Sequence, residues 1–279
     1  MTEESQLLHQ VEKARSAVVA YSGGVDSTVV AVAAWKVFGA SGMRAVTGDS
    51  PSVARSEIES ARTIAAAMGF PWTAAPTDEI HDVRYIANTV SRCYFCKSEL
   101  YQVLDHLRQE WHFDVIMDGF NQDDTREFRP GARAGIEYRV MSPLKEAGLG
   151  KAAVRRLAQK WGLPNWDKPA SPCLASRIPY QVPVTPERLQ QVEEAEDALH
   201  RLGYRNLRVR HHEEVARIEV PVDQMDRLLA DREAVVAAVK RAGYQFVTLD
   251  LVGLSSGTFA RLTMGASLQS MGDRGASDT

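Results

Sequence analysis

Short apolar runs alternate with amphipathic stretches over the first 160 residues of the chain. The runs predict buried strands at residues 17–21, 44–50, 72–75 and 114–118. Apolar positions at helical spacing predict helices at residues 25–38, 52–68, 96–109 and 151–161, the first two ending at Gly39 and Gly69. This alternation is typical of an α/β fold with a parallel, doubly wound sheet that binds ligands at the carboxyl ends of its strands.

The pattern changes between residues 164 and 186, where six prolines exclude a long helix and predict a rigid, extended crossing. Beyond it we expect helices at 186–202 and 225–241 and strands at 206–211, 215–220 and 245–252, an α+β order. These patterns predict a first domain at residues 1–178, a smaller α+β domain at 179–264 and a disordered tail at 265–279.

The first predicted strand runs into a glycine-rich turn that opens the first predicted helix. Gly23 and Gly24 let backbone N–H groups close around an anion, and the start of the helix offers further amides. Ser22 and Ser27 add hydroxyl donors, and Asp26 can hold Mg²⁺. No Gly-Lys-Ser/Thr follows, so the turn is not a Walker loop. We interpret Ser22 to Ser27 as a pyrophosphate-gripping, ATP-binding loop.

Polar residues also follow two other predicted strands. Thr47, Asp49 and Ser50 end the second strand and are predicted to hold adenine and ribose. After the fourth strand, Gly119 permits close approach to a nucleotide, and Asp124 is a second candidate ligand for Mg²⁺. The sequence assigns no role to four charged neighbours, Asp123, Arg126, Arg129 and Lys145.

The three cysteines suggest a metal centre. Cys93 and Cys96 form a Cys-x-x-Cys at a predicted helix start, where thiolates are favoured, and Cys173 lies in the proline-rich crossing. Three thiolates are one short of a closed four-ligand iron–sulfur site, so a 4Fe–4S cluster held this way keeps one iron open. Structural zinc needs a fourth ligand, and three unrelated buried thiols are the remaining interpretation.

Two arginines in the second predicted domain suggest an anion site. Arg208 and Arg210 lie on one face of a strand, and paired guanidinium groups suit a phosphate or two carboxylates, although a solvated strand face is the commoner arrangement. Glu193, Glu194 and Glu196 are expected to face solvent on a helix. Of these three, only Glu196 is a candidate catalytic residue, in addition to Cys173 and Asp26.

Composition narrows the class of protein. The net charge of −3 argues against a general nucleic-acid binder, and no apolar run approaches the roughly 20 residues of a membrane span. The acidic N-terminus lacks the basic and apolar regions of a signal peptide. We therefore expect a cytoplasmic enzyme.

Together these motifs resemble the LarE family, the ATP-dependent sulfur transferases of nickel-pincer nucleotide synthesis, over roughly Leu7 to Gly257. Ser22 to Ser27 is similar to the family's PP-loop, which other ATP pyrophosphatases share, and Asn121 to Asp124 is similar to its Gly-x-Asn-x-Asp-Asp turn. More specific is the segment Trp166 to Tyr180, which contains the family's Pro-Cys-Leu-Ala-Ser-Arg, with Gln181 where glycine is usual.

The resemblance implies that ATP adenylates a carboxylate of a pyridinium biscarboxylic acid mononucleotide, after which sulfur displaces AMP to give a thiocarboxylate. It associates Arg208 and Arg210 with the substrate phosphate, and we add Arg177 to this set. In one form of the family a lone cysteine at position 173 gives up its own sulfur and becomes dehydroalanine; in the other, two more cysteines join it to hold a 4Fe–4S cluster. Cys93 and Cys96 make this chain similar to the cluster form.

The expected partners are the pyridinium mononucleotide, sulfide or a sulfur-donor protein, and further copies of the chain, with no membrane and no stably bound nucleic acid. Three alternatives remain open at this point. A cluster-dependent tRNA thiolase also joins a PP-loop to three cysteines, an amidotransferase-type synthetase would use ammonia, and a nucleotide-sensing protein would bind without catalysis.

Overall fold

The computed structural model describes residues 2–126, 130–169 and 171–254. They form two compact units, one of the described residues up to 85 and within 91–172, and the other of residues 86–90 and 173–254. The second unit begins at Cys173, six residues before the predicted boundary, and it also takes a short segment, residues 86–90, from the N-terminal half. The tail that the sequence predicts to be disordered, residues 265–279, lies outside the described residues.

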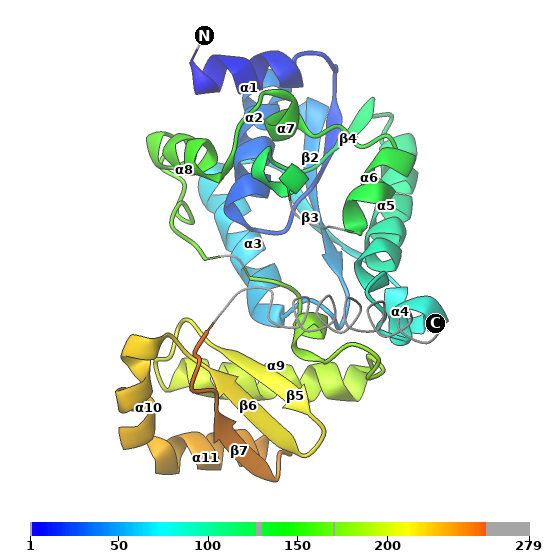
Figure 1. The fold of residues 1–279 in the computed structure, drawn as a ribbon. Helices are drawn as coiled ribbons and strands as arrows, with labels where there is room; N and C mark the ends of the chain where they lie inside the picture. Colours follow the sequence, from blue (N-terminus) through cyan, green and yellow to red (C-terminus); the bar gives the residue numbers. More distant parts are fainter. Residues whose placement is uncertain (1, 127–129, 170, 255–279) are drawn as a thin grey trace, which may run out of the picture. The chain divides into compact units, whose positions relative to one another are not determined.

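The first unit is built on a parallel sheet with strand order β3-β2-β1-β4 (Figure 1). The strands are β1 (Ala17–Ala20), β2 (Met43–Asp49), β3 (Trp72–Pro76) and β4 (Val115–Met117). Every pair in the sheet is parallel. The predicted α/β fold with a parallel sheet is therefore confirmed.

Helices cover both faces of this sheet because its strands are apolar on both sides. Ala17, Val19 and Tyr21 face a core that includes residues of α1 (Glu3–Val11), α2 (Val25–Gly42), α3 (Arg55–Met68), α7 (Pro143–Glu146) and α8 (Lys151–Lys160). Val18 and Ala20 face the opposite core, with α5 (Arg92–Glu110) and α6 (Gly131–Glu137). The short segments η1 (Glu79–His81), α4 (Val83–Ile86) and η2 (Asp123–Arg126) complete the order.

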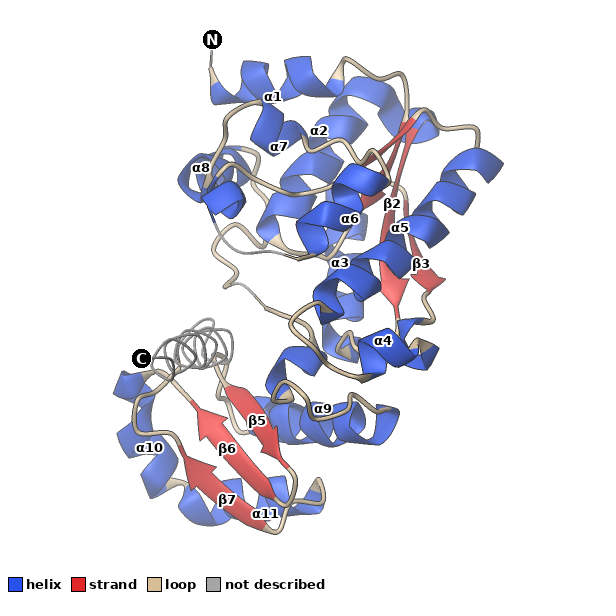
Figure 2. Cartoon of the chain, turned by 45° about the vertical axis from the view of Figure 1, so that its right-hand side comes forward, coloured by secondary structure: helices blue, strands red, loops and turns tan. Residues whose placement is uncertain are grey.

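The second unit has a three-stranded sheet of order β5-β6-β7, drawn in red in Figure 2. Strands β5 (Arg208–His212) and β6 (Val215–Glu219) are antiparallel, and β7 (Phe246–Leu249) is parallel to β6. One core joins the sheet to α9 (Pro186–Arg201), α10 (Met225–Ala230) and α11 (Arg232–Arg241). Two short segments, η3 (Leu174–Arg177) and η4 (Val222–Gln224), precede α9 and α10.

Two sequence predictions change with the structure. The single helix expected at 225–241 is wrong: it is two helices broken at Asp231, whose backbone leaves the helical range and whose carboxylate accepts a hydrogen bond from Tyr204 Oη at 2.7 Å. The stop predicted at Gly39 coincides with a non-helical residue, at φ 69° and ψ −176°, although α2 continues beyond it to Gly42. Within the described chain, no helix combines the length and the apolar character that crossing a membrane requires.

Candidate functional site

The turn between β1 and α2 has a conformation that requires glycine at its centre. Gly23 has φ +71°, and a Cβ atom there would lie 3.1 Å from Ala61 Cβ on α3. A side chain would therefore meet both an unfavourable backbone conformation and a packed neighbour. The chain enters α2 through Gly24, which supplies no side-chain cap to the helix start.

Hydroxyl and amide groups of this turn gather at the N-terminus of α2. Ser22 Oγ and Ser27 Oγ lie 3.1 Å apart, the backbone N–H of Ser22 donates to Ser27 Oγ at 3.2 Å, and that of Gly24 donates to Ser22 Oγ at 3.3 Å. The first amides of a helix have no intrahelical acceptor and carry partial positive charge. Donors collected in this way suit a phosphate or pyrophosphate group.

An acidic pair lies beside the turn. Asn121 Nδ2 donates to Asp26 Oδ1 at 3.0 Å, and the Asn121 backbone N–H donates to Asp124 Oδ2 at 3.2 Å. Burial raises the pKa of Asp26, and the charge of Asp124 raises it further, against the hydrogen bond from Asn121. Lys151 Nζ lies 3.6 Å from Asp124 Oδ1. Two close carboxylates in a buried setting are a donor set that fits Mg²⁺, which would offset their repulsion.

The polar residues at the end of β2 lie next to the turn, because β2 is the parallel neighbour of β1. Thr47 Oγ1 donates to Tyr21 O at 2.7 Å and accepts from Trp72 Nε1 at 2.8 Å, and Ser50 Oγ donates to Glu79 Oε1 at 2.6 Å. Asp49 pairs with Arg55. The two hydroxyls are buried and hold the strand ends together. Contact of Thr47, Asp49 and Ser50 with a nucleotide stays a prediction.

Glycine is needed at position 119 for a packing reason that was not predicted from the sequence. A Cβ atom there would lie 2.7 Å from the backbone N of Ser27 and 3.0 Å from the carbonyl carbon of Asp26. The glycine therefore lets the end of β4 pack directly against the start of α2. Its predicted contact with ATP is not tested by this packing.

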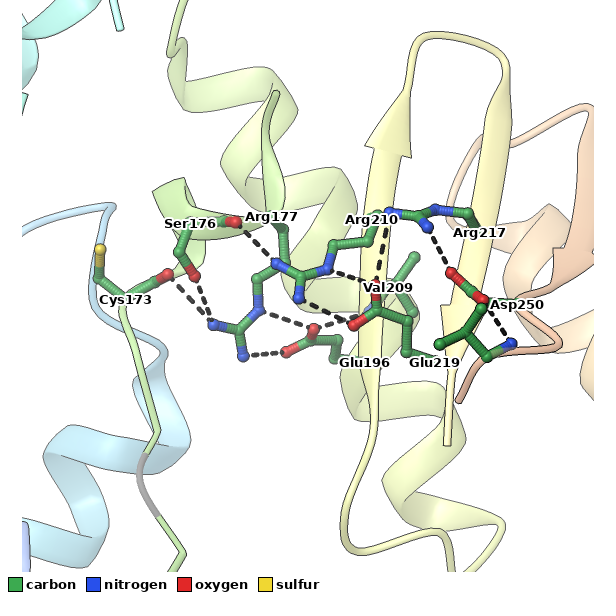
Figure 3. Close-up of polar contacts among 10 residues, drawn as sticks. Cys173, Ser176, Arg177, Glu196, Val209, Arg210, Arg217, Glu219 and Asp250 are labelled. Atoms are coloured by element: carbon green, nitrogen blue, oxygen red, sulfur yellow. Dashed lines mark hydrogen bonds and ion pairs between the residues drawn. The ribbon is translucent and has the colours of Figure 1, made fainter. Parts of the chain in front are cut away.

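In the second unit, two buried arginines hold the turn that carries Cys173 (Figure 3). Arg177 Nη1 donates to Cys173 O at 3.2 Å, and its Nε and Nη2 form a two-bond ion pair with Glu196 at 2.9 and 3.0 Å. Glu196 also accepts from the Val209 backbone N–H at 2.9 Å. The expectation that Glu196 faces solvent is wrong, because its side chain is 8% exposed and neutralises a buried guanidinium.

Arg210 is the second buried arginine that holds the turn carrying Cys173. Its guanidinium pairs with Glu219 at 3.0 and 2.8 Å and donates through Nη1 to Ser176 O at 2.9 Å. Arg208 lies half-buried on the same strand, where burial, followed by the charges of Arg210 and Arg177, lowers its pKa. The substrate roles of the three arginines stay predictions.

The cysteines lie in both units. Cys93 and Cys96 are near the start of α5, in the first unit, and Cys173 precedes η3 in the second. None of the three forms a disulfide. Among the residues that the structure describes, no cluster of three His, Cys, Asp or Glu side chains is arranged to hold a metal ion. The chemistry of the donor set still fits the predicted cluster, so the 4Fe–4S site stays a prediction.

Sequence analysis missed two groups near these sites. Lys97, one residue after Cys96, approaches Tyr101 Oη at 3.5 Å, and Tyr101 donates to Asp118 Oδ2 at 2.9 Å. Asn165 donates from Nδ2 to Gly23 O at 3.0 Å. Only the helical spacing of Lys97 and Tyr101 was visible in the sequence; the partner of Asn165 is 142 positions away.

The residues without an assigned role have local contacts. Asp123 Oδ2 accepts from the Lys151 backbone N–H at 2.7 Å, and Lys145 Nζ lies 6.0 Å from the Phe120 ring centre. Arg129 is outside the described residues, and the structure describes the backbone of Arg126 but not its side chain.

Comparison with known proteins agrees with the geometry of the first unit. The family described as NAD synthase matches residues 4–92, which contain β1, the turn and α2. An uncharacterised protein of Synechocystis sp. is 44% identical over 88% of this chain and 92% of its own length. An uncharacterised protein of Methanocaldococcus jannaschii is 26% identical over 86% of this chain and 90% of its own length.

The most informative relative is a protein of Lactiplantibacillus plantarum named pyridinium-3,5-bisthiocarboxylic acid mononucleotide synthase. It is 34% identical to this chain over 92% of the chain and 93% of its own length. Similarity of this degree covers both units. The chain therefore belongs to the LarE family, the family of this synthase.

Proposed function

We propose that this protein is an ATP-dependent sulfur transferase that converts a carboxylate of pyridinium-3,5-biscarboxylic acid mononucleotide into a thiocarboxylate, in the cytoplasm. Family membership supports the substrate, since the relative from Lactiplantibacillus plantarum is named for the bisthiocarboxylic acid product. The observation that carries the proposal is the group of donors from Ser22, Gly24 and Ser27 at the start of α2, which suits released pyrophosphate.

The first step activates the carboxylate. A carboxylate oxygen of the substrate attacks the α-phosphorus of ATP, the bond to the β,γ-unit breaks, and pyrophosphate leaves. The turn would stabilise the charge on pyrophosphate as it develops. Asp26 and Asp124 would hold Mg²⁺, which neutralises phosphate charge when bound. The acyl adenylate then carries AMP as its leaving group, which an unactivated carboxylate lacks.

The second step brings in sulfur. A sulfur nucleophile attacks the acyl carbon, AMP leaves with its electron pair, and a carbon–sulfur bond replaces the carbon–oxygen bond. Cys93, Cys96 and Cys173 would hold a 4Fe–4S cluster, and such a cluster supplies an open iron that carries sulfide. Sulfide or a sulfur-donor protein would replenish it, and we assign Arg208 and Arg210 on β5, together with Arg177, to the substrate phosphate.

The alternative within the same family is sacrificial transfer. Cys173 Sγ would attack the acyl adenylate and displace AMP to form a thioester. Elimination would then remove the Cα proton of residue 173 to solvent and break its Cβ–Sγ bond, leaving dehydroalanine and the thiocarboxylate. The contacts of Arg177 with Cys173 O and of Arg210 with Ser176 O support either route, because both hold the turn that presents the thiol. A tRNA thiolase is disfavoured by the similarity to the mononucleotide synthase over both units.

The test is anaerobic purification of the full chain, followed by iron and sulfide analysis and assay with ATP and the pyridinium mononucleotide. We expect about four irons per chain, substrate-dependent release of AMP and pyrophosphate, and several turnovers when sulfide is supplied. Cys93→Ala should lose the iron and all turnovers after the first. Ser98→Ala, one turn further along α5, is the matched control and should keep both.

The outcomes separate the two routes. An iron-free protein with dehydroalanine at position 173 after one turnover would establish the sacrificial route. Absence of pyrophosphate release with this substrate, together with thiolation of tRNA, would refute the proposed acceptor.

A further inference from the structure

Asn165 contacts the back of the PP-loop, Ser22 to Ser27. It follows α8 in the first unit and is only 5% exposed. Its Nδ2 donates two hydrogen bonds, to Gly23 O at 3.0 Å and to Thr28 Oγ1 at 2.9 Å. Its position is fixed by its neighbours, since Arg155 donates to the carbonyl of Trp166, and Lys168 pairs with Glu57 on α3 at 2.6 Å.

The orientation of the Asn165 amide follows from its partners. Gly23 O can only accept, and Thr28 Oγ1 already donates to Gly24 O at 2.8 Å, so it also accepts from Asn165. Both partners therefore require the NH₂ group of Asn165, and the opposite amide orientation would direct Oδ1 at two acceptors. Asn165 thus acts on the loop as a donor.

A peptide bond relates this contact to the anion site. In a trans peptide, the C=O of one residue and the N–H of the next point in opposite directions. Asn165 holds the Gly23 carbonyl on its own side, so the N–H of Gly24 points the other way, toward Ser22 Oγ at 3.3 Å. Neither Gly23 nor Gly24 has a Cβ atom that resists a flip of this peptide. A flip would replace a donor at the anion site by a carbonyl oxygen.

We propose that Asn165 is a positioning residue for pyrophosphate binding, because it holds the Gly23–Gly24 peptide with its N–H toward the anion site. The inference rests on the proposed function only in taking pyrophosphate as the ligand of the loop. It is independent of the sulfur acceptor and of the cluster. Asn165 touches no reacting atom in this arrangement and acts through the loop backbone.

The test measures binding of magnesium pyrophosphate and of AMP to the full chain by isothermal titration calorimetry. Asn165→Asp keeps the side-chain shape but places an oxygen against Gly23 O, so we expect pyrophosphate affinity to fall at least tenfold while AMP affinity stays within about twofold. Thr28→Val keeps the bond to Gly23 O and should weaken pyrophosphate binding by less than about threefold. If Asn165→Asp does not fold, Asn165→Ala is measured against the same expectations.

Asn88→Ala is the matched control. Asn88 is another buried asparagine that donates to backbone carbonyls, of Pro179 and Val182 at 2.8 Å each, but it lies in the second unit. The Asn88→Ala substitution should lower the midpoint temperature of unfolding and leave pyrophosphate affinity unchanged. Wild-type pyrophosphate affinity in a folded Asn165 variant, or an equal loss of AMP and pyrophosphate affinity, would overturn the inference. Failure of the proposed sulfur transfer would appear separately, as absent product with intact pyrophosphate binding.

Discussion

The two units use buried polar groups in opposite ways. In the first unit, the neutral donors of Ser22, Gly24 and Ser27 gather at a helix N-terminus, where they can take an anion. In the second unit, the cations of Arg177 and Arg210 are each neutralised by a buried glutamate of the protein itself. An anion site in a protein interior can thus be made of uncharged groups, whereas buried arginines can serve mainly to hold the chain.

This difference indicates that the two buried arginines of the second unit position the protein backbone. The two ion pairs, Arg177–Glu196 and Arg210–Glu219, both end on carbonyls of the Cys173 turn (Figure 3). A buried guanidinium that is paired and also bonded to backbone fixes that backbone strongly, because leaving any of its donors unused is costly. The Cys173 turn is therefore held by paired charges, whereas the Gly23 carbonyl of the PP-loop is held by a neutral amide.

The largest expected effect comes from breaking one ion pair. Glu219→Gln removes the charge that balances the buried Arg210 guanidinium, and such a change costs about 3–5 kcal/mol. The stabilities of the two units can be compared within one molecule, because all five tryptophans belong to the first unit and their fluorescence reports its unfolding. We expect the urea midpoint from far-ultraviolet circular dichroism to fall, while the transition from tryptophan fluorescence stays at its wild-type position.

The control for this prediction is the double variant Arg210→Met with Glu219→Leu. Replacing both partners of a buried pair by apolar side chains of similar volume is often neutral, so its free energy of unfolding should recover most of the loss. A Glu219→Gln protein with unchanged stability in both signals would show that the pair is not a structural element.

A smaller effect is expected at the PP-loop. Gly23→Ala adds a Cβ atom at φ +71° and 3.1 Å from Ala61 Cβ, so it should cost roughly 1–2 kcal/mol and weaken pyrophosphate binding about tenfold or more. Gly69→Ala is the matched control at φ +78°, where the nearest atom is 3.8 Å away. It should lower stability by about 1 kcal/mol with no change in pyrophosphate affinity. Equal pyrophosphate affinities for the two variants would contradict a special role for Gly23.

The PP-loop was predictable from sequence because its residues are contiguous and lie between a strand and a helix that each have a clear period. The partners that orient it were not, since Asn165 is 142 positions from Gly23 and Asn121 is 95 from Asp26. The same limit explains Glu196. Its burial depends on Arg177, which is 19 positions away, and helical periodicity alone suggested an exposed carboxylate.

The smallest effect concerns a buried histidine in the second unit. Burial lowers the pKa of His211, against the charge of Glu213, whose Oε2 lies 3.9 Å from Nε2; Arg188 and His212 lower it further. Its Nδ1 lies 3.2 Å from Tyr244 Oη. The unfolded chain therefore takes up the proton first as pH falls, so this stabilising contribution is complete above about pH 6.5 and is lost below it.

We expect the urea midpoint of unfolding of the wild-type protein, followed by circular dichroism, to fall when the pH is lowered from 7.5 to 5.5. His211→Leu should reduce that shift, because the buried side chain no longer titrates. His9→Gln, at an exposed position of α1 in the first unit, should leave it unchanged. A shift of full size in His211→Leu would assign the pH dependence to other groups, of which His212 is the nearest, since burial also lowers its pKa.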